Sequence, residues 1–154
     1  MRYHYLIIDG YNLLHTDSTL VECASTHLQE ARHRLVRMIE KTAFQTAKHT
    51  IVVFDGQSAG EDSALSTDVI EVIFSPSNLT ADSIIERLVE GCPDPEKVLV
   101  ITSDRAEQTT VQSTGAHVFS SSEFMNQCLC ANKIPTATTS RPTPTSKLGD
   151  FFPE

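Results

Sequence analysis

The chain has 154 residues and a formal net charge of −8, from 12 Lys and Arg against 20 Asp and Glu. This length suits one domain with a single core and one additional segment. The acidic balance argues against a protein that holds nucleic acid by its overall charge, but not against an enzyme that engages it through a local patch. No apolar run is long enough to cross a bilayer, and MRYHYLIID does not resemble a signal peptide, so we expect a cytoplasmic protein without membrane association.

The first part of the chain predicts two buried strands separated by one helix. Residues 3–8 (YHYLII) form an apolar strand that ends at Asp9-Gly10. Residues from about 25 to 48 carry apolar side chains at the three-and-four spacing of an amphipathic helix. The run TIVVF at 50–54, closed by Asp55-Gly56, is typical of an interior strand in a parallel sheet.

The rest of the folded part alternates strands with helices after a loop at 57–67 that is rich in Ser, Gly and acidic residues. Apolar and β-branched runs predict strands at 69–74, 98–102 and 116–120. Capping and stop signals predict helices from Thr80 to Gly91, from Ser103 or Asp104 to near Gly115, and over 121–133. Such alternation forms βαβ units, so we expect an α/β fold with a parallel sheet covered on both faces.

The composition changes at residue 134, where a segment rich in Thr, Ser and Pro begins. This segment cannot bury a core of its own. We therefore expect a folded domain over residues 1–133 and a flexible tail over 134–154. The tail either has no role, acts as a short docking peptide, or folds back on the domain as a strap.

Four aspartates lie where an apolar strand ends or a helix begins: Asp9, Asp55, Asp82 and Asp104. In an open α/β sheet this edge is where ligands bind. Each aspartate alone has an ordinary explanation as a turn residue or a helix cap. Together they predict a shared site, because gathered carboxylates repel one another unless a cation lies between them. We rank Asp55 below Asp9 as a ligand and allow it a hydrogen-bonding role.

Polar and basic residues near these aspartates complete the predicted site. Asn12 offers an amide to phosphate or water, and Glu86 lies on the same helical face as Asp82. Ser103 either caps a helix or positions a ligand, and Arg105 places a guanidinium beside the acids. The candidate RNA contacts, which would otherwise be a solvated helix face, are Arg32, Arg34, Arg37 and Arg105.

Several motifs in order resemble the YacP-like branch of the NYN domains, relatives of the PIN-domain nucleases. They are LIIDGYNLL, the arginine of EARHRLVRMI, VVFDG, IFSPSNLTADSIIERLV, VLVITSDRAEQ and GAHVFSSSEF, and they span about 3–124. The resemblance implies a PIN-like three-layer α/β/α sandwich with a central, mostly parallel sheet. It also implies a metal-dependent endoribonuclease, and characterised members of this branch act on mRNA within the translating ribosome.

The resemblance also assigns roles to particular residues. Asp9, Asp82 and Asp104, with Asn12 alongside, correspond to the acidic site of the family. Arg32, Ser103 and Arg105 match motif positions whose role is structural or RNA-contacting. Two features depart from the recognised pattern of the family: the acidic loop after Asp55 lacks basic residues, and the tail has no recognised counterpart.

The main hypothesis is therefore an endoribonuclease that uses one or two Mg²⁺ or Mn²⁺ ions held by Asp9, Asp82 and Asp104. It would activate water against a phosphodiester and leave 5′-phosphate and 3′-hydroxyl ends. The alternative is a catalytically weak or inactive module that binds RNA or the ribosome through a nuclease-like scaffold, which the net charge of −8 motivates.

Overall fold

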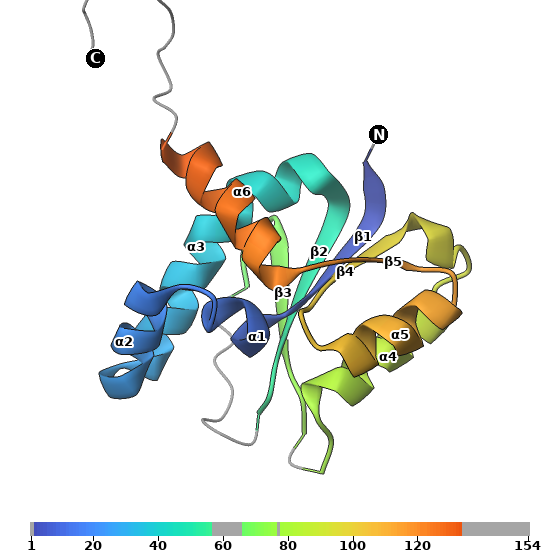
Figure 1. Ribbon diagram of the computed structural model, residues 1–154, viewed down its shortest axis with the longest axis horizontal. Helices are drawn as coiled ribbons and strands as arrows, with labels where there is room; N and C mark the ends of the chain where they lie inside the picture. The colour runs from blue at the N-terminus through green and yellow to red at the C-terminus, as the bar shows by residue number, and fades with distance from the viewer. Residues whose placement is uncertain (1, 57–65, 77, 134–154) are drawn as a thin grey trace, which may run out of the picture.

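Five parallel strands form one sheet in the order β3-β2-β1-β4-β5 (Figure 1). The strands are β1 (Tyr3–Asp9), β2 (Ala47–Phe54), β3 (Ile70–Phe74), β4 (Val98–Ile101) and β5 (His117–Phe119). This computed structural model describes residues 2–56, 66–76 and 78–133. Most of the predicted loop at 57–67 and the whole predicted tail at 134–154 lie outside the described residues.

Helices cover both faces of the sheet (Figure 1). One layer contains α1 (Gly10–Leu14), α2 (Ser18–Thr26), α3 (Leu28–Thr46) and α6 (Ser121–Lys133). The other contains α4 (Ala81–Glu90) and α5 (Arg105–Ser113), and a short 3-10 turn, η2 (Pro95–Lys97), precedes β4. The expected three-layer α/β/α architecture is confirmed. No helix in the described ranges is both long enough and apolar enough to cross a membrane.

β1 lies at the centre of the sheet, between β2 and β4. Successive side chains of a strand point to opposite faces. Leu6 and Ile8 therefore pack into the layer that contains α3, whereas Ile7 packs into the layer that contains α4. Both faces of β1 are buried, which explains why its sequence is a continuous apolar run.

The chain order places a topological switch beside β1. After β1 the chain builds β2 and β3 on one side of it, and then returns to build β4 and β5 on the other side. Helices that follow β1 and β4 consequently start on opposite faces of the sheet. A crevice outside the carboxyl ends of the strands is expected at such a switch.

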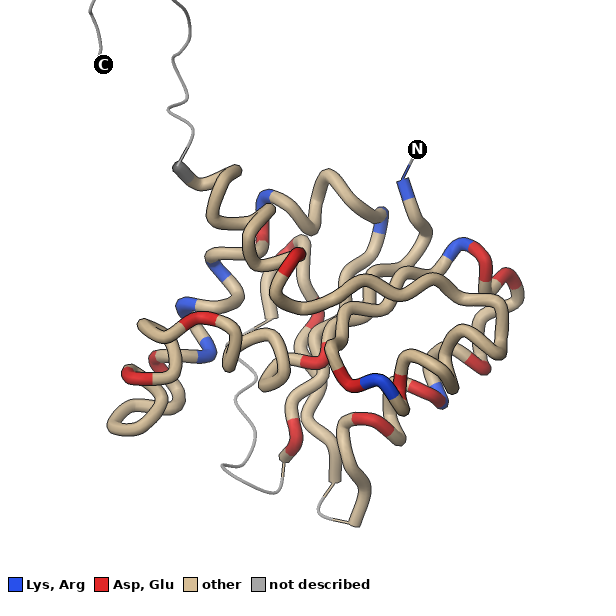
Figure 2. Tube along the Cα trace, viewed as in Figure 1, with Lys and Arg blue, Asp and Glu red and all other residues tan. Residues whose placement is uncertain are grey.

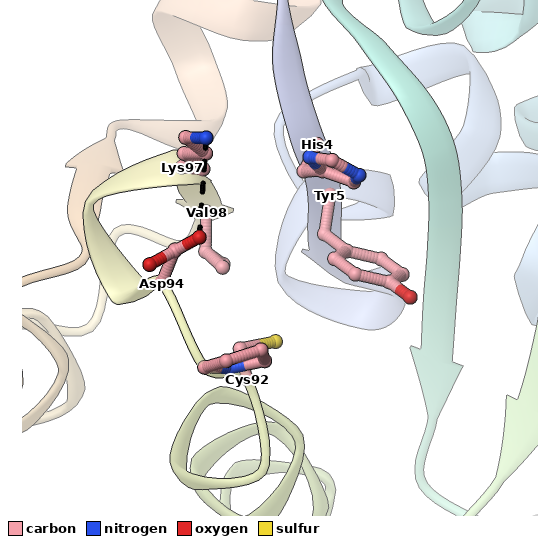
Figure 3. A pocket seen from close by; sticks show the side chains of 7 residues that line it. His4, Tyr5, Cys92, Asp94, Lys97 and Val98 are labelled. Carbon is pink, nitrogen blue, oxygen red and sulfur yellow. Dashed lines mark ion pairs between the residues drawn. The ribbon is translucent and has the colours of Figure 1, made fainter.

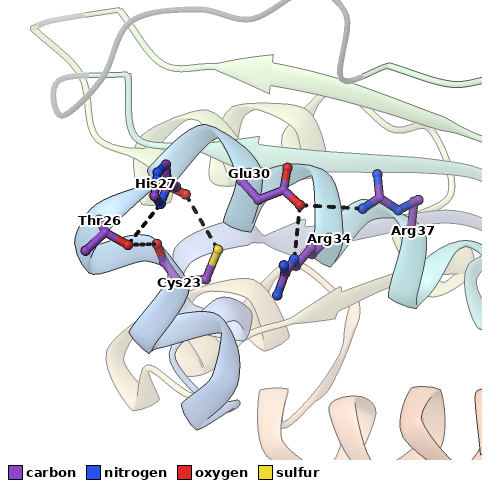
Figure 4. Close-up of polar contacts among 6 residues, drawn as sticks. All are labelled: Cys23, Thr26, His27, Glu30, Arg34 and Arg37. Carbon is purple, nitrogen blue, oxygen red and sulfur yellow. Dashed lines mark hydrogen bonds and ion pairs between the residues drawn. The ribbon is translucent and has the colours of Figure 1, made fainter.

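The helix predicted over about 25–48 is present as α3, over Leu28–Thr46, but α2 before it was not predicted, and the two helices meet at His27 (Figure 4). α2 starts earlier, where the Asp17 carboxylate accepts hydrogen bonds from the N–H groups of Thr19 and Leu20. The chain leaves the helical conformation at His27, with φ −140° and ψ 77°, and α3 begins at the next residue. β2 begins at Ala47, inside the range predicted as helix.

Candidate metal centre

Three carboxylates from different elements converge at the carboxyl edge of the sheet. Asp9 ends β1, Asp82 lies in the first turn of α4, and Glu107 lies in the first turn of α5. One oxygen from each lies within 4.8 Å of the others. The three residues are separated by long stretches of sequence, so the topology of the sheet, and not local chain geometry, brings them together.

Asp9 is held in place by the turn that follows β1. Its side chain caps α1, where Oδ1 accepts a hydrogen bond of 3.3 Å from the backbone N–H of Asn12. The pKa of Asp9 is raised from 3.8 to about 6, mainly by burial and also by the charges of Asp82, Asp104 and Asp55, while the hydrogen bond from Asn12 opposes the rise. Simultaneous ionisation of all the carboxylates at this site is therefore unfavourable.

Glu107 is the most deeply buried of the three carboxylates, with 2% of its surface exposed. Neither of its oxygens has a hydrogen-bond partner, although both are buried. The pKa of Glu107 is raised to about 8, mainly by burial and then by the neighbouring carboxylates of Asp82 and Asp9. Buried carboxylate oxygens without donors fit a divalent cation with oxygen ligands, as the chemistry of Mg²⁺ or Mn²⁺ requires.

Glu107 was not among the predicted site residues, although the sequence contains a signal for it. It lies three residues after the helix cap at Asp104, where an acidic residue normally stabilises the helix start. Val111 lies one turn further along α5 and is also buried, so the two residues share the inward face of the helix. The clue in the sequence was therefore an acidic residue, Glu107, on the same face of the predicted helix as the apolar Val111.

Asp104 and Asp55 lie close enough to the centre for their charges to raise the pKa of Asp9. Asp104 caps α5, and its Oδ1 accepts hydrogen bonds of 2.9 and 3.3 Å from the N–H groups of Ala106 and Glu107. Asp55 follows β2 and is half-buried. Glu86 is half-buried one turn beyond Asp82, and the three-carboxylate cluster does not include it.

An open cleft of about 450 Å³ gives access to this site, and we call it the acidic cleft. Its walls include Asp9, Asp55 and Asp82, together with Tyr11 and Asn12 from α1. A second cavity, of about 180 Å³, lies at the opposite end of β1, around its His4 and Tyr5 and near Cys92 (Figure 3). That cavity lacks a carboxylate cluster among the described residues, so the acidic cleft is the candidate site.

Asn12 connects three segments that are distant in sequence. Its side-chain oxygen accepts hydrogen bonds from the backbone N–H of Ser103, at 2.8 Å, and from the hydroxyl of Ser121. The Ser103 hydroxyl in turn accepts a bond of 3.0 Å from the N–H of Ser121. The amide oxygen of Asn12 is thus occupied by the protein and positions the loops around Asp9. Ser121, at the start of α6, was not predicted.

Arg32 lies in the interior, with 2% of its surface exposed. Its Nε donates a hydrogen bond of 3.0 Å to the hydroxyl of Tyr11. Its guanidinium lies between 5.1 and 5.9 Å from the ring centroids of Tyr11, Phe54 and Phe74. Of the two roles that the family resemblance allows, this placement favours the structural one.

The other predicted RNA contacts are exposed. Arg34 and Arg37 of α3 both approach the Glu30 carboxylate, at 3.1 and 4.0 Å (Figure 4). The basic residues of α3 lie along that helix, apart from the carboxylates at the strand ends (Figure 2). Arg105 is the first residue of α5, directly after Asp104, and its side chain is exposed.

Comparison with known proteins places the chain in a family. The sequence profile of the YacP-like NYN domain matches residues 6–147, which include the three carboxylates. The protein YacP of Bacillus subtilis is 31% identical over 124 residues, which are 79% of this chain and 73% of YacP.

Two crystal structures of Rae1 (YacP) from Bacillus subtilis, one of them of a mutant form, share the fold. Their TM-scores are 0.72 and 0.69, at 28% and 29% identity. Each match covers 84% of this chain, and 75% and 77% of the respective Rae1 chains. These matches indicate a nuclease-type protein, and the chain belongs to the YacP-like NYN domain family.

Proposed function

We propose that this protein is a metal-dependent endoribonuclease that cleaves RNA in the acidic cleft. One observation carries the proposal: Asp9, Asp82 and Glu107 present oxygens within 4.8 Å of one another, and both Glu107 oxygens are buried without a partner. A purely structural cluster would be expected to have donors around it, because unpaired buried carboxylates destabilise a fold. The family membership supports the same class of activity.

Each residue has a role that follows from its place. Asp9, Asp82 and Glu107 would hold Mg²⁺ or Mn²⁺, and Asp104 and Asp55 would add negative charge that strengthens cation binding. A divalent cation bound there would supply activation of water and neutralisation of charge on the scissile phosphate. Asn12 keeps the loop after β1 fixed against Ser103 and Ser121, so that Asp9 stays aligned with its partners.

The substrate follows from the family resemblance and from the openness of the site. We propose that the RNA is mRNA, that the ribosome is a partner, and that the protein works in the cytoplasm. A protein with a net charge of −8 repels free RNA at long range, so delivery by a partner would compensate for weak intrinsic affinity. Arg105 is exposed beside Asp104 and is the basic residue best placed to contact phosphate.

The second candidate is an inactive module that binds RNA or the ribosome, and the same net charge favours it. Calorimetric titration with Mn²⁺ separates the two functions. An endoribonuclease requires a saturable cation site that Asp82→Asn removes, whereas a binding module retains its partner without such a site.

The decisive experiment measures RNA cleavage with and without Mn²⁺, EDTA and ribosomes. We expect Asp9→Asn, Asp82→Asn and Glu107→Gln each to reduce cleavage by at least about 100-fold, because each removes a charge at the reacting centre. Glu90→Gln, an exposed change at the far end of α4, is the matched control and should cleave as the wild type does. Unchanged cleavage by Asp9→Asn or Asp82→Asn would contradict the proposal.

A further inference from the structure

His15 lies where the acidic cleft meets a neighbouring open cleft, which is not the cavity near His4. We infer that His15 binds a backbone phosphate of the RNA strand that occupies the acidic cleft, and that the strand continues from there over α1 and α2. This inference rests on the proposed function and adds the path of the substrate. It concerns a residue outside the family motifs described above.

The position of His15 follows from the short helix α1. Its backbone N–H donates a hydrogen bond of 3.0 Å to the carbonyl of Tyr11 and ends the helix. Residues four apart share one helical face, so Tyr11 and His15 both line the acidic cleft. The Tyr11 ring is fixed by the bond from Arg32 and by the Phe54 ring at 4.9 Å. His15 therefore extends from a rigid support.

The charge of the acidic cleft makes His15 distinctive. Three aspartates line the cleft, and His15 is the one described lining residue whose side chain can carry a positive charge. In the sequence, residues 57–65, which follow Asp55 and Gly56, contain no Lys, Arg or His. A phosphate that enters the cleft needs donors, and an imidazole offers an N–H donor whether it is neutral or charged.

The ring of His15 has no structural role that would explain its presence. It makes no hydrogen bond, ion pair or ring contact with any residue in the described ranges, and its side chain is exposed. The ring is thus available to a ligand. Hydrogen bonds from the backbone N–H hold the main chain whatever the side chain does.

The neighbouring cleft at His15 has a volume of about 530 Å³. Its lining differs from that of the acidic cleft and suits the nucleotides of the strand next to the bound phosphate. Three residues that carry hydroxyl groups, Thr16, Ser18 and Thr19, line it together with Val21 and Glu22. Val21 is 39% exposed and offers an apolar contact for a base. Because Glu22 repels phosphate, this cleft fits ribose hydroxyls and base edges, and His15 is the phosphate contact at its entrance.

The test compares His15→Ala, His15→Asn and His4→Ala in two assays. The first is cleavage of a short single-stranded RNA with Mn²⁺, and the second is binding of the same fluorescent RNA to these variants in an Asp82→Asn background. We expect His15→Ala to raise both KM and Kd about 5- to 20-fold with kcat nearly unchanged, because a hydrogen bond to a charged phosphate is lost. His15→Asn, which keeps an N–H donor, should recover part of the affinity.

His4→Ala is the matched control, since His4 is also exposed but lies at the opposite end of β1. Wild-type cleavage together with an unchanged KM and Kd in His15→Ala would overturn the inference and leave the proposed function intact. Absence of wild-type cleavage together with weaker RNA binding by His15→Ala would overturn the proposed function and retain the RNA contact. An equal loss of affinity in His4→Ala would also overturn the inference.

Discussion

Replacement of Glu107 by Gln tests whether the buried Glu107 carboxylate binds a cation. The change keeps the size of the side chain and removes its ionisation. In the folded chain the pKa of Glu107 lies at about 8, above the ordinary value of 4.5. The folded protein therefore keeps a proton that the unfolded chain releases, and metal-free stability falls as the pH rises from about 4.5 towards about 8.

The size of this effect follows from the pKa. A change from 4.5 to about 8 corresponds to about 5 kcal/mol. A buried Gln amide without partners costs about 1–3 kcal/mol. At pH 8 without metal, Glu107→Gln should therefore be more stable than the wild type by about 2–4 kcal/mol, or about 6–12 °C in Tm.

The assay is thermal unfolding followed by circular dichroism at pH 5, 6, 7 and 8, in EDTA and in Mn²⁺. We expect the Tm of the metal-free wild type to fall towards pH 8, and that of Glu107→Gln to change much less. Mn²⁺ at about 100 times its Kd should restore about 3 kcal/mol to the wild type at pH 8, and much less to the variant. Parallel pH profiles for the two proteins in EDTA, or equal stabilisation of both by Mn²⁺, would refute the reasoning.

Three further substitutions test how the site is supported, each by urea unfolding at neutral pH. Gly10→Ala should lower the free energy of unfolding by about 1–3 kcal/mol, because its Cβ would lie 2.5 Å from the Phe54 ring. An unchanged urea midpoint of unfolding would contradict this close packing. Arg32→Ala should lower the free energy of unfolding by about 3 kcal/mol, because Arg32 is buried against aromatic rings. Arg34→Ala is the control, an exposed change on the same helix, and should lower it by less than about 0.5 kcal/mol. Equal losses would show that the Arg32 contacts are not structural. Ser121→Ala should lower the free energy of unfolding by about 1 kcal/mol and also lower kcat, because its hydrogen bond to the Asn12 oxygen is lost. Full activity of this variant would show that the hydrogen bonds of Asn12 do not contribute to catalysis.

The sheet was predictable because interior parallel strands have continuous apolar sequences. The predicted strands over 3–8, 69–74 and 98–102 match β1, β3 and β4 within one residue at each end. The sequence did not predict α2. Leu20 is the one buried residue of this helix, so α2 has no apolar stripe at helical spacing.

The candidate site was predictable in part, since its residues follow from sheet topology. Asp9 and Asp82 could be placed at one edge from the order of strands and helices, and the structure brings them together. The inward direction of Glu107 could not be read from its cap position, which by itself explains an acidic residue. Likewise, the burial of Arg32 depends on aromatic residues contributed by β2 and β3, far along the chain.

The asparagine oxygen that receives bonds from Ser103 and Ser121 has a consequence for the order of events during synthesis. The loop that carries Asp9 emerges from the ribosome first, yet one of its anchors belongs to α6, more than a hundred residues later. A growing chain can pair β1 with β2 while this loop still lacks both donors. We therefore expect the proposed RNA cleavage to require docking of α6, so that an incomplete chain would not cleave the message from which it is translated.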